Sequence, residues 1–405
     1  MSSQPASVPL YPQVGFPEDA GLPALPKLFD GDWVWEASRP HLPAWETAPA
    51  QIRVRQFIHN PGRTASVSYI AEWDPEEYIP SEIFTFRIQA GRSVVISRYP
   101  EDDALPGLEE VADPNSALRL LNRHVFAIPR RRLRVEMVRY RPGSRAVLRH
   151  RTKNIRLYVR VMRPAAIANL LAGGSLMGHS GFVIPRVAGC WEEGGVVWLS
   201  EIPGKNVRQR MRKGKPPDPN AILDSLEGLW AAPYRSDERA FDLAGAYRRA
   251  KRTFRHALRA HEDARRILDR TTRALDPFAR SWRPSTIAHN DLYDDQMLVL
   301  ADGRVAMVDF EEAGPGDPML DVGNFLAHLK WASRLGRKPK SDVSGAYYER
   351  LRAAALGRFR WSEQELNLRE AVCLFRITTN TIRRIDSGWQ ERTIAALRMV
   401  NESLG

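Results

Sequence analysis

The segment that decides the fold is IAHNDLYDDQMLVLADGRVAMVDFEEAGPGDPMLDVGNF, residues 287–325. Within it, two short apolar runs rich in β-forming residues, Met297–Leu300 and Arg304–Val308, flank Asp302-Gly303. An Asp-Gly pair between such runs is typical of a β-hairpin with a two-residue loop, because both residues tolerate positive φ. We therefore expect an antiparallel hairpin with polar residues at both ends.

A two-residue loop would fix how the two strands pair. Ala301 would then oppose Arg304, and Gln296 would oppose Asp309. Directly opposed side chains on one face lie about 5 Å apart at Cβ. A carboxylate and an amide oxygen placed in this way can share one hard cation, since Mg²⁺ takes oxygen ligands and is usually held by one or two protein groups plus phosphates. The sequence thus predicts a magnesium site beside Asp291, which lies in the loop before the hairpin.

The order of polar residues in this segment resembles a known catalytic core. His289-x-Asp291 is followed by Gln296, a hairpin, Asp-Phe-Glu from Asp309, and Gly-Asp-Pro-x-x-Asp ending at Asp321. This order resembles the aminoglycoside phosphotransferase and choline kinase superfamily, whose small-molecule kinases have a protein-kinase-like fold. Most members carry Asn as the metal-binding amide. Gln at that position together with Asp-Phe-Glu is more similar to the maltokinase branch and related phosphotransferases.

The resemblance implies a role for each motif residue. Asp291 would be the catalytic base that accepts a hydroxyl proton, and His289 would support its loop. Gln296 and Asp309 would be the metal ligands, and Asp321 would be the buried acid that fixes the loop backbone. Phosphoryl transfer needs positioning and charge neutralisation more than covalent help, so a base, a metal amide and a metal carboxylate form a sufficient minimum.

Glu311 lies two residues beyond Asp309 and would face the same side if the strand continues. It is therefore a candidate for an additional metal ligand. The alternative interpretation is an acidic hairpin with a solvated end, since Asp and Glu cluster in turns for local hydrogen-bonding reasons. Five polar positions at family spacing around one hairpin favour the kinase-like interpretation.

The composition is that of an ordinary globular protein. With 405 residues, 43% hydrophobic and 27% charged, the chain is long enough for two or three domains with full cores.

Cys190 and Cys373 are far apart and have no partners at metal-binding spacing. This argues against a disulfide framework or a zinc site and fits a reducing cytoplasm. The first residues lack a basic region followed by an apolar core, so neither a signal peptide nor a membrane span is predicted.

The net charge of +12 raises the question of nucleic-acid binding, because clustered cations supply most non-specific affinity for phosphate backbones. The arginines are spread along the whole chain, however, and no known nucleic-acid motif stands out. A basic kinase that attracts a nucleotide, and an anionic acceptor, explains the charge more simply. We therefore expect no nucleic-acid partner and no membrane partner.

We expect an α+β protein of the bilobal protein-kinase-like kind, with a small β-rich N-lobe and a helical C-lobe, preceded by an extra β-rich domain. Residues 1–29 are predicted to be a Pro-rich tail, and residues 30–128 the extra β-rich domain. Residues 129–204 would form the N-lobe, and residues 205–405 the helical C-lobe with the catalytic hairpin. The basic run Lys205–Lys215 would be a solvated loop or would bind an anionic acceptor.

Two segments resemble each other at an offset of 81 residues: RVRQFIHNPGRTASVSY, residues 53–69, and RVEMVRYRPGSRAVLRH, residues 134–150. Both have the pattern strand, Pro-Gly turn, strand. Each is followed by an apolar strand ending near Arg and Pro, SVVISRYP and YVRVMRP. Either the first domain duplicates the front half of a small lobe, or two ordinary hairpins share their turn chemistry.

The second copy would be the nucleotide-binding one, since it directly precedes the rest of the kinase pattern. Its turn, Tyr140–Arg145, would cover the nucleotide phosphates: Gly143 permits close approach, while Arg145 and backbone N–H groups face the negative charge. By resemblance, the backbone of Glu201 and Ile202 would form the hinge that holds adenine.

The third strand of a kinase small lobe normally presents a Lys to the α- and β-phosphates. Here Arg160 stands at that place; it keeps the charge but its planar fork is not a geometric copy of an ammonium group. The alternative is an outward-facing strand residue. The helix that should follow, AAIANLLAGG, carries no Glu, so the usual Lys–Glu ion pair cannot form from these residues.

The predicted function is transfer of the ATP γ-phosphate to a hydroxyl group of a small molecule, with a sugar or aminosugar as the expected acceptor and ATP and Mg²⁺ as cofactors. The alternative is a catalytically silent kinase-like protein that binds nucleotide or serves as a scaffold. Arg160 and the missing helix Glu favour the alternative, whereas Asp291 and Asp309, both present, oppose it.

Overall fold

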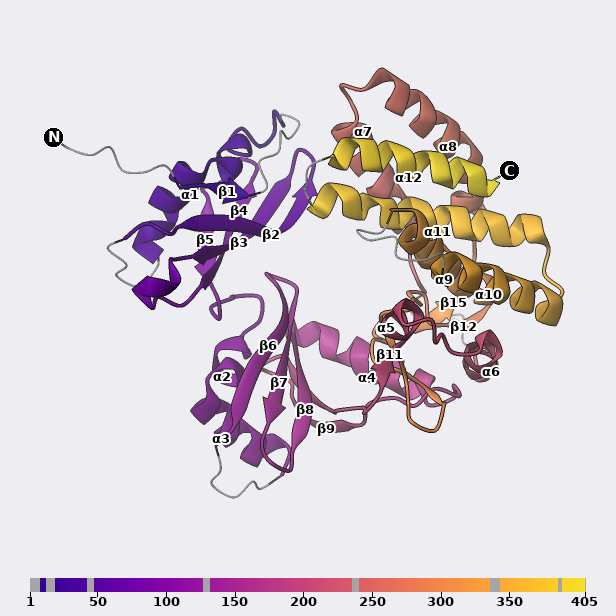
Figure 1. Ribbon diagram of the computed structural model, residues 1–405, viewed down its shortest axis with the longest axis horizontal. Coiled ribbons are helices and arrows are strands. Elements are labelled where there is room, and N and C mark those ends of the chain that lie inside the picture. Colours follow the sequence, from indigo (N-terminus) through magenta and orange to yellow (C-terminus); the bar gives the residue numbers. More distant parts are fainter. Residues whose placement is uncertain are drawn as a thin grey trace.

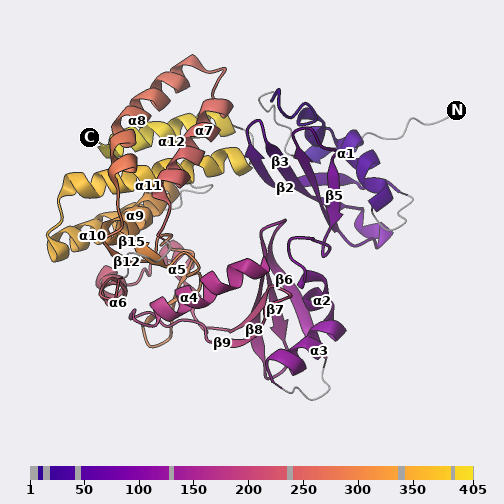
Figure 2. The same ribbon diagram turned by 180° about the vertical axis from the view of Figure 1, so that it is seen from behind.

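The computed structural model describes residues 8–11, 19–41, 47–126, 132–234, 240–335, 343–384 and 388–404. Figures 1 and 2 show, from opposite sides, a first β-sheet near the N-terminus, a second β-sheet with its own helices, and a C-terminal part built mainly of helices. The predicted α+β fold, with β-rich N-terminal parts and a helical C-terminal part, is confirmed.

The first sheet has the strand order β1-β2-β3-β4-β5. Strand β1 runs parallel to β2, and the other neighbours are antiparallel. Helix α1 begins where the Asp30 side chain accepts hydrogen bonds from the N–H groups of Asp32 and Trp33, an N-cap that satisfies two free donors. The elements are β1 (Leu10–Tyr11), α1 (Gly31–Ser38), β2 (Gln51–Asn60), β3 (Thr64–Glu72), β4 (Glu82–Gln89) and β5 (Val95–Arg98).

The prediction that residues 1–29 form a tail is wrong for the part of this segment that the structure describes. Five of its apolar residues are buried in the core of the first sheet, where burial of each side chain from water stabilises the fold. These residues are Val8, Leu10, Leu22, Leu25 and Leu28. Among the described residues of this segment, Pro9, Pro23 and Pro26 therefore lie in a chain that packs on the sheet.

The second sheet has the order β6-β7-β8-β10-β9, with all neighbours antiparallel. Helices α2 and α3 share one buried core with it, for example Leu108 and Leu121 with Leu148. These two helices therefore belong with the second sheet and not, as predicted, with the first domain. The elements are α2 (Leu108–Ala112), α3 (Pro114–His124), β6 (Arg134–Arg141), β7 (Arg145–Arg151), β8 (Arg156–Met162), α4 (Ile167–Met177), β9 (Val187–Trp191) and β10 (Val196–Ser200).

The two similar segments form hairpins of the same geometry. Gly62 and Gly143 both adopt the left-handed conformation in the turn, with φ of 70° and 69°. The first strand of each hairpin also carries a register shift part-way along. The residues that flank the turns pair identically at the offset of 81 residues: Asn60 with Thr64 and Arg141 with Arg145.

The likeness extends to the third strand, although not to the one that the sequence indicates. Strand β4, not the SVVISRYP strand β5, pairs with the first hairpin, just as β8 pairs with the second. Arg87 opposes Ser66 in the first sheet, and Arg160 opposes Val147, which matches Ser66 at the same offset. A shared arginine on the third strand goes beyond turn chemistry and favours a duplication.

The helical lobe packs its helices around two buried cores. Among the described residues, no helix is both long and apolar enough to cross a bilayer. The elements of this lobe are β11 (Lys205–Asn206), α5 (Val207–Arg212), α6 (Pro219–Trp230), α7 (Leu243–Ala257), α8 (Glu262–Ser281), β12 (Thr286–Ala288), β13 (Met297–Val299), β14 (Val305–Met307), β15 (Gly314–Gly316), α9 (Pro318–Leu335), α10 (Val343–Phe359), α11 (Glu363–Arg384) and α12 (Trp389–Leu404).

The basic run Lys205–Lys215 is not simply a solvated loop, because it contains β11 and α5. The side chain of Arg208 donates to both carboxylate oxygens of Asp294 at 2.8 Å. It also lies 3.3 Å from Asp295. One cation of this basic run, Arg208, therefore fixes the acidic loop that precedes the hairpin.

The predicted hairpin is present as β13 and β14, but its register differs from the prediction by one residue. Val299 opposes Val305, and the Leu300 N–H donates to the Arg304 carbonyl at 2.9 Å. The loop therefore has three residues and ends at Gly303, whose φ is 89°; this matches a type I turn followed by a left-handed residue. As a consequence, Gln296 lies opposite Val308, whose N–H donates to the Gln296 carbonyl at 3.0 Å, and not opposite Asp309.

Candidate active site

The loop between β12 and β13 is fixed by a buried carboxylate. Asp321, in the first turn of α9, has no exposed surface. It accepts hydrogen bonds from the backbone N–H groups of His289 at 2.8 Å and Asn290 at 2.7 Å. The Trp230 indole N–H donates to it at 3.1 Å. Burial raises the pKa of Asp321 to about 7, although these donors favour the charged form. Asp321 thus occupies the loop-fixing place that the resemblance implies.

Asn290 connects this loop to the segment after the hairpin. Its backbone is left-handed, with φ of 65°, a conformation that Asn tolerates better than most residues. Its side-chain amide donates to the carbonyls of Glu312 at 2.9 Å and Gly314 at 3.2 Å. Sequence reasoning did not single out Asn290. The only signal was its place between His289 and Asp291.

Asp291 follows directly and is half-buried. Burial raises its pKa to about 7; the negative charges of Asp309 and Glu312 act in the same direction, whereas Arg376 and Arg145 oppose it. A carboxyl group with a pKa near 7 is suited to accept a proton from an alcohol, because it combines useful basicity with a substantial ionised fraction. The side chain therefore has the acidity that the predicted base requires.

His289 is buried and neutral. Burial is the main cause that lowers its pKa, to about 4. Neither ring nitrogen has a hydrogen-bond partner among the described residues. Its backbone N–H, held by Asp321, is the contact through which His289 supports the loop.

Gln296 lies beside the expected base. Its Nε2 is 3.4 Å from Asp291 Oδ2, and its Oε1 accepts from the Tyr293 N–H at 3.3 Å. The predicted cross-strand pairing of Gln296 with Asp309 is wrong, because the three-residue loop shifts the register. The amide oxygen keeps a second lone pair for another partner. The structure thus brings Gln296 to the site through Asp291.

Asp309 and Glu311 form an ion-pair cluster with Arg160 and Arg145. Arg160 lies 3.2 Å from Asp309 Oδ1, donates to the Val308 carbonyl at 2.8 Å, and pairs with Glu311. Arg145 lies 2.8 Å from Glu311 and 3.6 Å from Asp309. The interpretation of Arg160 as an outward-facing residue is therefore wrong; its side chain is only 11% exposed.

This cluster keeps the Asp309 carboxylate ionised. Burial alone would raise the pKa of Asp309, but Arg160 and Arg145 outweigh it, so that the net pKa lies below the ordinary value. The two arginines come from β7 and β8, whereas the two acids follow β14. The ion pairs therefore join the second sheet to residues 308–312 after β14, here called the catalytic segment.

The Pro-Gly turn between β6 and β7 is held by Asp102, which precedes it in the chain, and by Arg163, which follows it. The Gly143 N–H donates to Asp102 at 2.7 Å, and so does the Tyr140 hydroxyl at 2.9 Å. The Gly143 carbonyl accepts from Arg163 at 2.7 Å. A Cβ at Gly143 would lie 2.4 Å from the Arg87 guanidinium, which shows how closely Arg87 packs on the turn. The Gly143 N–H, predicted to face phosphate, is thus directed at Asp102.

Glu201 and Ile202, the predicted hinge, lie in the half-buried connection after β10. The Glu201 N–H donates to the Arg156 carbonyl at 3.3 Å, and its carboxylate pairs with Arg156 at 3.4 Å. These contacts belong to the edge of the second sheet. A role in holding adenine stays a prediction.

Helix α4, which carries no acidic residue, packs directly on the catalytic segment. A Cβ at Gly173 would lie 2.2 Å from the Phe310 carbonyl oxygen. Only glycine therefore allows the helix to come so close to the residue between Asp309 and Glu311. In place of a Lys–Glu pair with this helix, Arg160 pairs with the catalytic segment itself.

Arg376 is a residue of this region that sequence reasoning missed. It comes from α11, its guanidinium lies 4.8 Å from the Phe241 ring centre, and its Nη1 is buried with no hydrogen-bond partner among the described residues. Its charge lowers the pKa of Asp291. No local motif marks Arg376, which is one of several cations in α11.

The residues present fit a hard divalent cation with a nucleotide. Asp309, Glu311 and the Gln296 amide supply oxygen donors, the type that Mg²⁺ prefers. Arg145 and Arg160 supply planar donor groups that suit phosphate. The buried and unpaired Nη1 of Arg376 offers one more donor near Asp291. The cluster of Asp309 and Glu311 with Arg145 and Arg160 therefore joins oxygen donors of the kind that suits a metal to guanidinium groups of the kind that suits phosphate.

Residues 86–361 match the sequence profile of a family described as the phosphotransferase enzyme family. No curated protein sequence matches the chain. Among solved structures, choline kinase from Cryptosporidium parvum is 10% identical, with a TM-score of 0.48 over 72% of this chain and 95% of that one. Ethanolamine kinase from Plasmodium vivax is 9% identical, with a TM-score of 0.48 over 71% and 95%. An ADP-bound aminoglycoside phosphotransferase is 12% identical, with a TM-score of 0.45 over 67% and 94%.

Proposed function

Because this chain belongs to the phosphotransferase enzyme family, we propose that it transfers the γ-phosphate of ATP to a hydroxyl group of a small molecule. The observation that carries the proposal is the placement of Asp291. It sits on a loop fixed by Asp321, and the charges of Asp309 and Arg145 act on its carboxyl group. A base next to a cluster of paired carboxylates and arginines supplies what phosphoryl transfer needs.

Each residue of the cluster has a part in this proposal. Asp291 accepts the proton of the acceptor hydroxyl as its oxygen attacks the γ-phosphorus and the bond to the β-phosphate oxygen breaks. Asp309 and Glu311 would hold Mg²⁺, and Gln296 would contribute its amide oxygen from beside Asp291. When bound, Mg²⁺ neutralises negative charge on the phosphates. Arg145 and Arg160, now paired with the carboxylates, donate to the phosphates.

The proposed acceptor is a sugar or aminosugar, in a maltokinase-like or aminoglycoside-phosphotransferase-like reaction. The combination of Gln296 with Asp-Phe-Glu supports the maltokinase-like variant. Arg376 adds a positive charge on the side of Asp291, which disfavours a strongly cationic acceptor by like-charge repulsion. Neutral sugars and sugar acids therefore belong in any acceptor panel beside the aminosugars.

The test is ADP formation from ATP and Mg²⁺ with a panel of neutral sugars, aminosugars, sugar acids and aminoglycosides. We expect ADP formation that depends on one acceptor class, and a phosphate monoester of that acceptor by mass spectrometry. Removal of the divalent cation with a chelator should abolish it. ATP binding without ADP formation on any acceptor would contradict the proposal.

A second candidate function is a catalytically silent nucleotide-binding protein. Two observations favour it: the Gly143 N–H donates to Asp102, and α4 offers no Glu to the second sheet. The acceptor panel separates the two functions. A silent protein would bind ATP, and its ATP turnover would be the same in wild type and in Asp291→Asn.

A further inference from the structure

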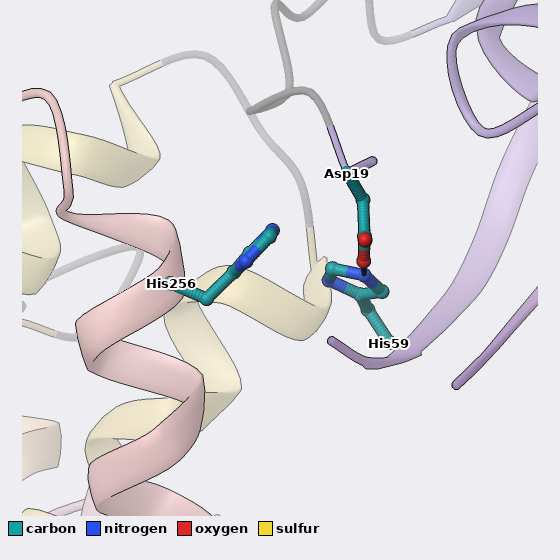
Figure 3. Close-up of side chains that lie close together, drawn as sticks. All are labelled: Asp19, His59 and His256. Atoms are coloured by element: carbon teal, nitrogen blue, oxygen red, sulfur yellow. Dashed lines mark hydrogen bonds and ion pairs between the residues drawn. The ribbon is translucent and has the colours of Figure 1, made fainter. Parts of the chain in front are cut away.

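Three side chains that play no part in the proposed reaction converge where the first sheet meets the helical lobe. Asp19 lies in the segment before α1, His59 near the end of β2, and His256 in the last turn of α7. One ligand atom of each lies within 4.8 Å of those of the other two. Figure 3 shows Asp19 and His256 on either side of the His59 ring. Sequence spacing could not reveal this cluster, since the three positions are far apart in the chain.

The cluster of Asp19, His59 and His256 is largely shielded from water. Asp19 and His59 are only 6% and 9% exposed, and His256 is half-buried. The His256 Nε2 is buried with no hydrogen-bond partner among the described residues. A buried polar atom without a partner normally costs about 1–3 kcal/mol, so it calls for an explanation. A bound ion that takes the lone pair of this nitrogen would provide one.

The protonation states suit metal binding. Burial is the main cause that lowers the pKa of His59 and the pKa of His256, which favours the neutral form of both rings. Burial alone would raise the pKa of Asp19, but hydrogen bonds from the Gly62 N–H and from His59 outweigh it, and the net pKa is lowered. Two neutral imidazoles and one carboxylate are the deprotonated forms that a divalent ion binds.

We propose that Asp19, His59 and His256 bind one divalent transition-metal ion of the zinc type, which fastens the first sheet to helix α7. Imidazole nitrogens with one carboxylate are ligands that Zn²⁺ accepts in tetrahedral geometry, with water as the fourth ligand. Hard ions such as Mg²⁺ prefer oxygen ligands and do not compete well here.

The present geometry is close to that of a bound site. His59 Nε2 lies 2.7 Å from Asp19 Oδ2, and the His59 and His256 ring centres lie 4.9 Å apart. Ligand atoms around a tetrahedral zinc ion are roughly 3.4 Å apart, which follows from bonds of about 2.0–2.2 Å. Small side-chain rotations would therefore seat the ion in place of the hydrogen bond between His59 Nε2 and Asp19 Oδ2, with the neutral His59 ring carrying its proton on Nδ1. His256 sits near the C-terminal end of α7, where the helix dipole favours positive charge.

The test measures metal binding to the full chain, prepared without a metal-affinity tag and stripped with a chelator. Zn²⁺ is titrated by calorimetry in excess Mg²⁺, which occupies the oxygen-rich active site, and Co²⁺ is followed by its visible absorption. We expect one ion per chain, a tetrahedral Co²⁺ spectrum, and a higher melting temperature with Zn²⁺. His256→Ala should weaken Zn²⁺ binding on the order of 100-fold or more, because loss of a direct ligand should exceed the effect of losing a second-sphere partner.

The matched control is His261→Ala, which removes an exposed histidine just beyond α7. It should bind Zn²⁺ like the wild type. If His256→Ala fails to fold, His256→Asn and the wild-type stoichiometry still decide the matter. The proposal is overturned if the wild-type chain binds no ion in excess Mg²⁺, or if His256→Ala and Asp19→Ala bind it as tightly as the control. The three residues would then be an ordinary hydrogen-bonded cluster between domains.

Discussion

The raised pKa of Asp291 results from burial and from residues that are close to it in space, and not from its neighbours in the sequence. The motif identified the residue, and the resemblance gave it the role of a base. Its pKa of about 7 results mainly from burial, against the opposing charges of Arg376 and Arg145. Both arginines reach it from distant elements, one from α11 and one from β7. A local motif can name such a residue, but only the packed structure shows why it can take up a proton near neutrality.

This acidity predicts a pH dependence. The raised pKa means that the folded protein holds the Asp291 proton up to about pH 7. Since the base must be deprotonated, kcat/KM for ATP should rise about tenfold per pH unit below pH 7 and level off above it. The measurement is a pH–rate profile at saturating acceptor. A kcat/KM that stays constant down to about pH 4, the pKa of an ordinary aspartate, would contradict the assignment of Asp291 as the base.

From the contacts of Arg160 and Arg145 we predict that replacing Arg160 lowers the free energy of unfolding more than replacing Arg145 does. Arg160 contacts Asp309, Glu311 and the Val308 carbonyl with only 11% of its side chain exposed, whereas Arg145 is 23% exposed. We expect Arg160→Met to lower the free energy of unfolding by about 2–3 kcal/mol, somewhat less than the about 3–5 kcal/mol for fully buried pairs. Arg145→Met should cost about 1 kcal/mol. Denaturant unfolding measures both, and an inverted order would contradict the assigned contacts.

At the scale of elements, the catalytic hairpin shows where the sequence stops being informative. Two β-rich runs around Asp302-Gly303 correctly predicted a hairpin. They could not decide between a two-residue loop and a three-residue loop, because Gly303 with positive φ suits both. The structure has the longer loop, and this single residue moves Gln296 away from Asp309 and towards Asp291. Register is set by long-range packing as much as by the turn.

We predict opposite outcomes when the two adjacent glycines of α4, Gly173 and Gly174, are each replaced by alanine. A Cβ at Gly173 would lie 2.2 Å from the Phe310 carbonyl oxygen, whereas one at Gly174 would meet only the Phe310 ring at 3.4 Å. Gly173→Ala should therefore displace the segment between Asp309 and Glu311, destabilise the protein by about 1–3 kcal/mol, and reduce activity.

Gly174→Ala is the matched control, because it has the same gain in helix propensity of about 0.5–1 kcal/mol without the collision. It should be neutral or slightly stabilising. Thermal unfolding and ATP turnover of the two variants provide the comparison. Equal behaviour would show that the close approach of α4 to Phe310 does not matter.

At the scale of the whole molecule, the Pro-Gly turn between β6 and β7 is contacted by Asp102, in the connection between the two sheets, and by Arg87 of the first sheet. The sequence predicted an extra β-rich domain with a tail, but not that Asp102 and Arg87 would hold the turn at Gly143. Nor did it predict that the early apolar residues would complete the core of that sheet. Contacts between residues far apart in the chain leave no periodic signal, so neither composition nor spacing could reveal them.

Asp102 offers a test of this coupling. Asp102→Ala removes the acceptor for the Gly143 N–H and the Tyr140 hydroxyl, both of which belong to buried residues. Unsatisfied donors of this kind cost about 1–3 kcal/mol. We expect that loss of stability, and a higher KM for ATP, because the turn over the phosphates is no longer held.

The control is the neighbouring exposed Asp103→Ala, whose effect on stability should stay within about 0.5 kcal/mol. Denaturant unfolding and steady-state kinetics of both variants decide the question. If the two variants are indistinguishable, Asp102 does not support the turn.

The central claim is that Asp291 is the base of a phosphotransferase, and the most direct measurement compares ATP turnover by wild type and Asp291→Asn with the best acceptor of the panel. The substitution keeps the size of the side chain but removes its basicity and its negative charge. Nucleotide affinity is measured in parallel, to separate a loss of turnover from a loss of nucleotide binding. We predict that turnover falls on the order of 10²–10⁴-fold while MgADP binds as it does to the wild type. Turnover by Asp291→Asn at the wild-type rate would contradict the account.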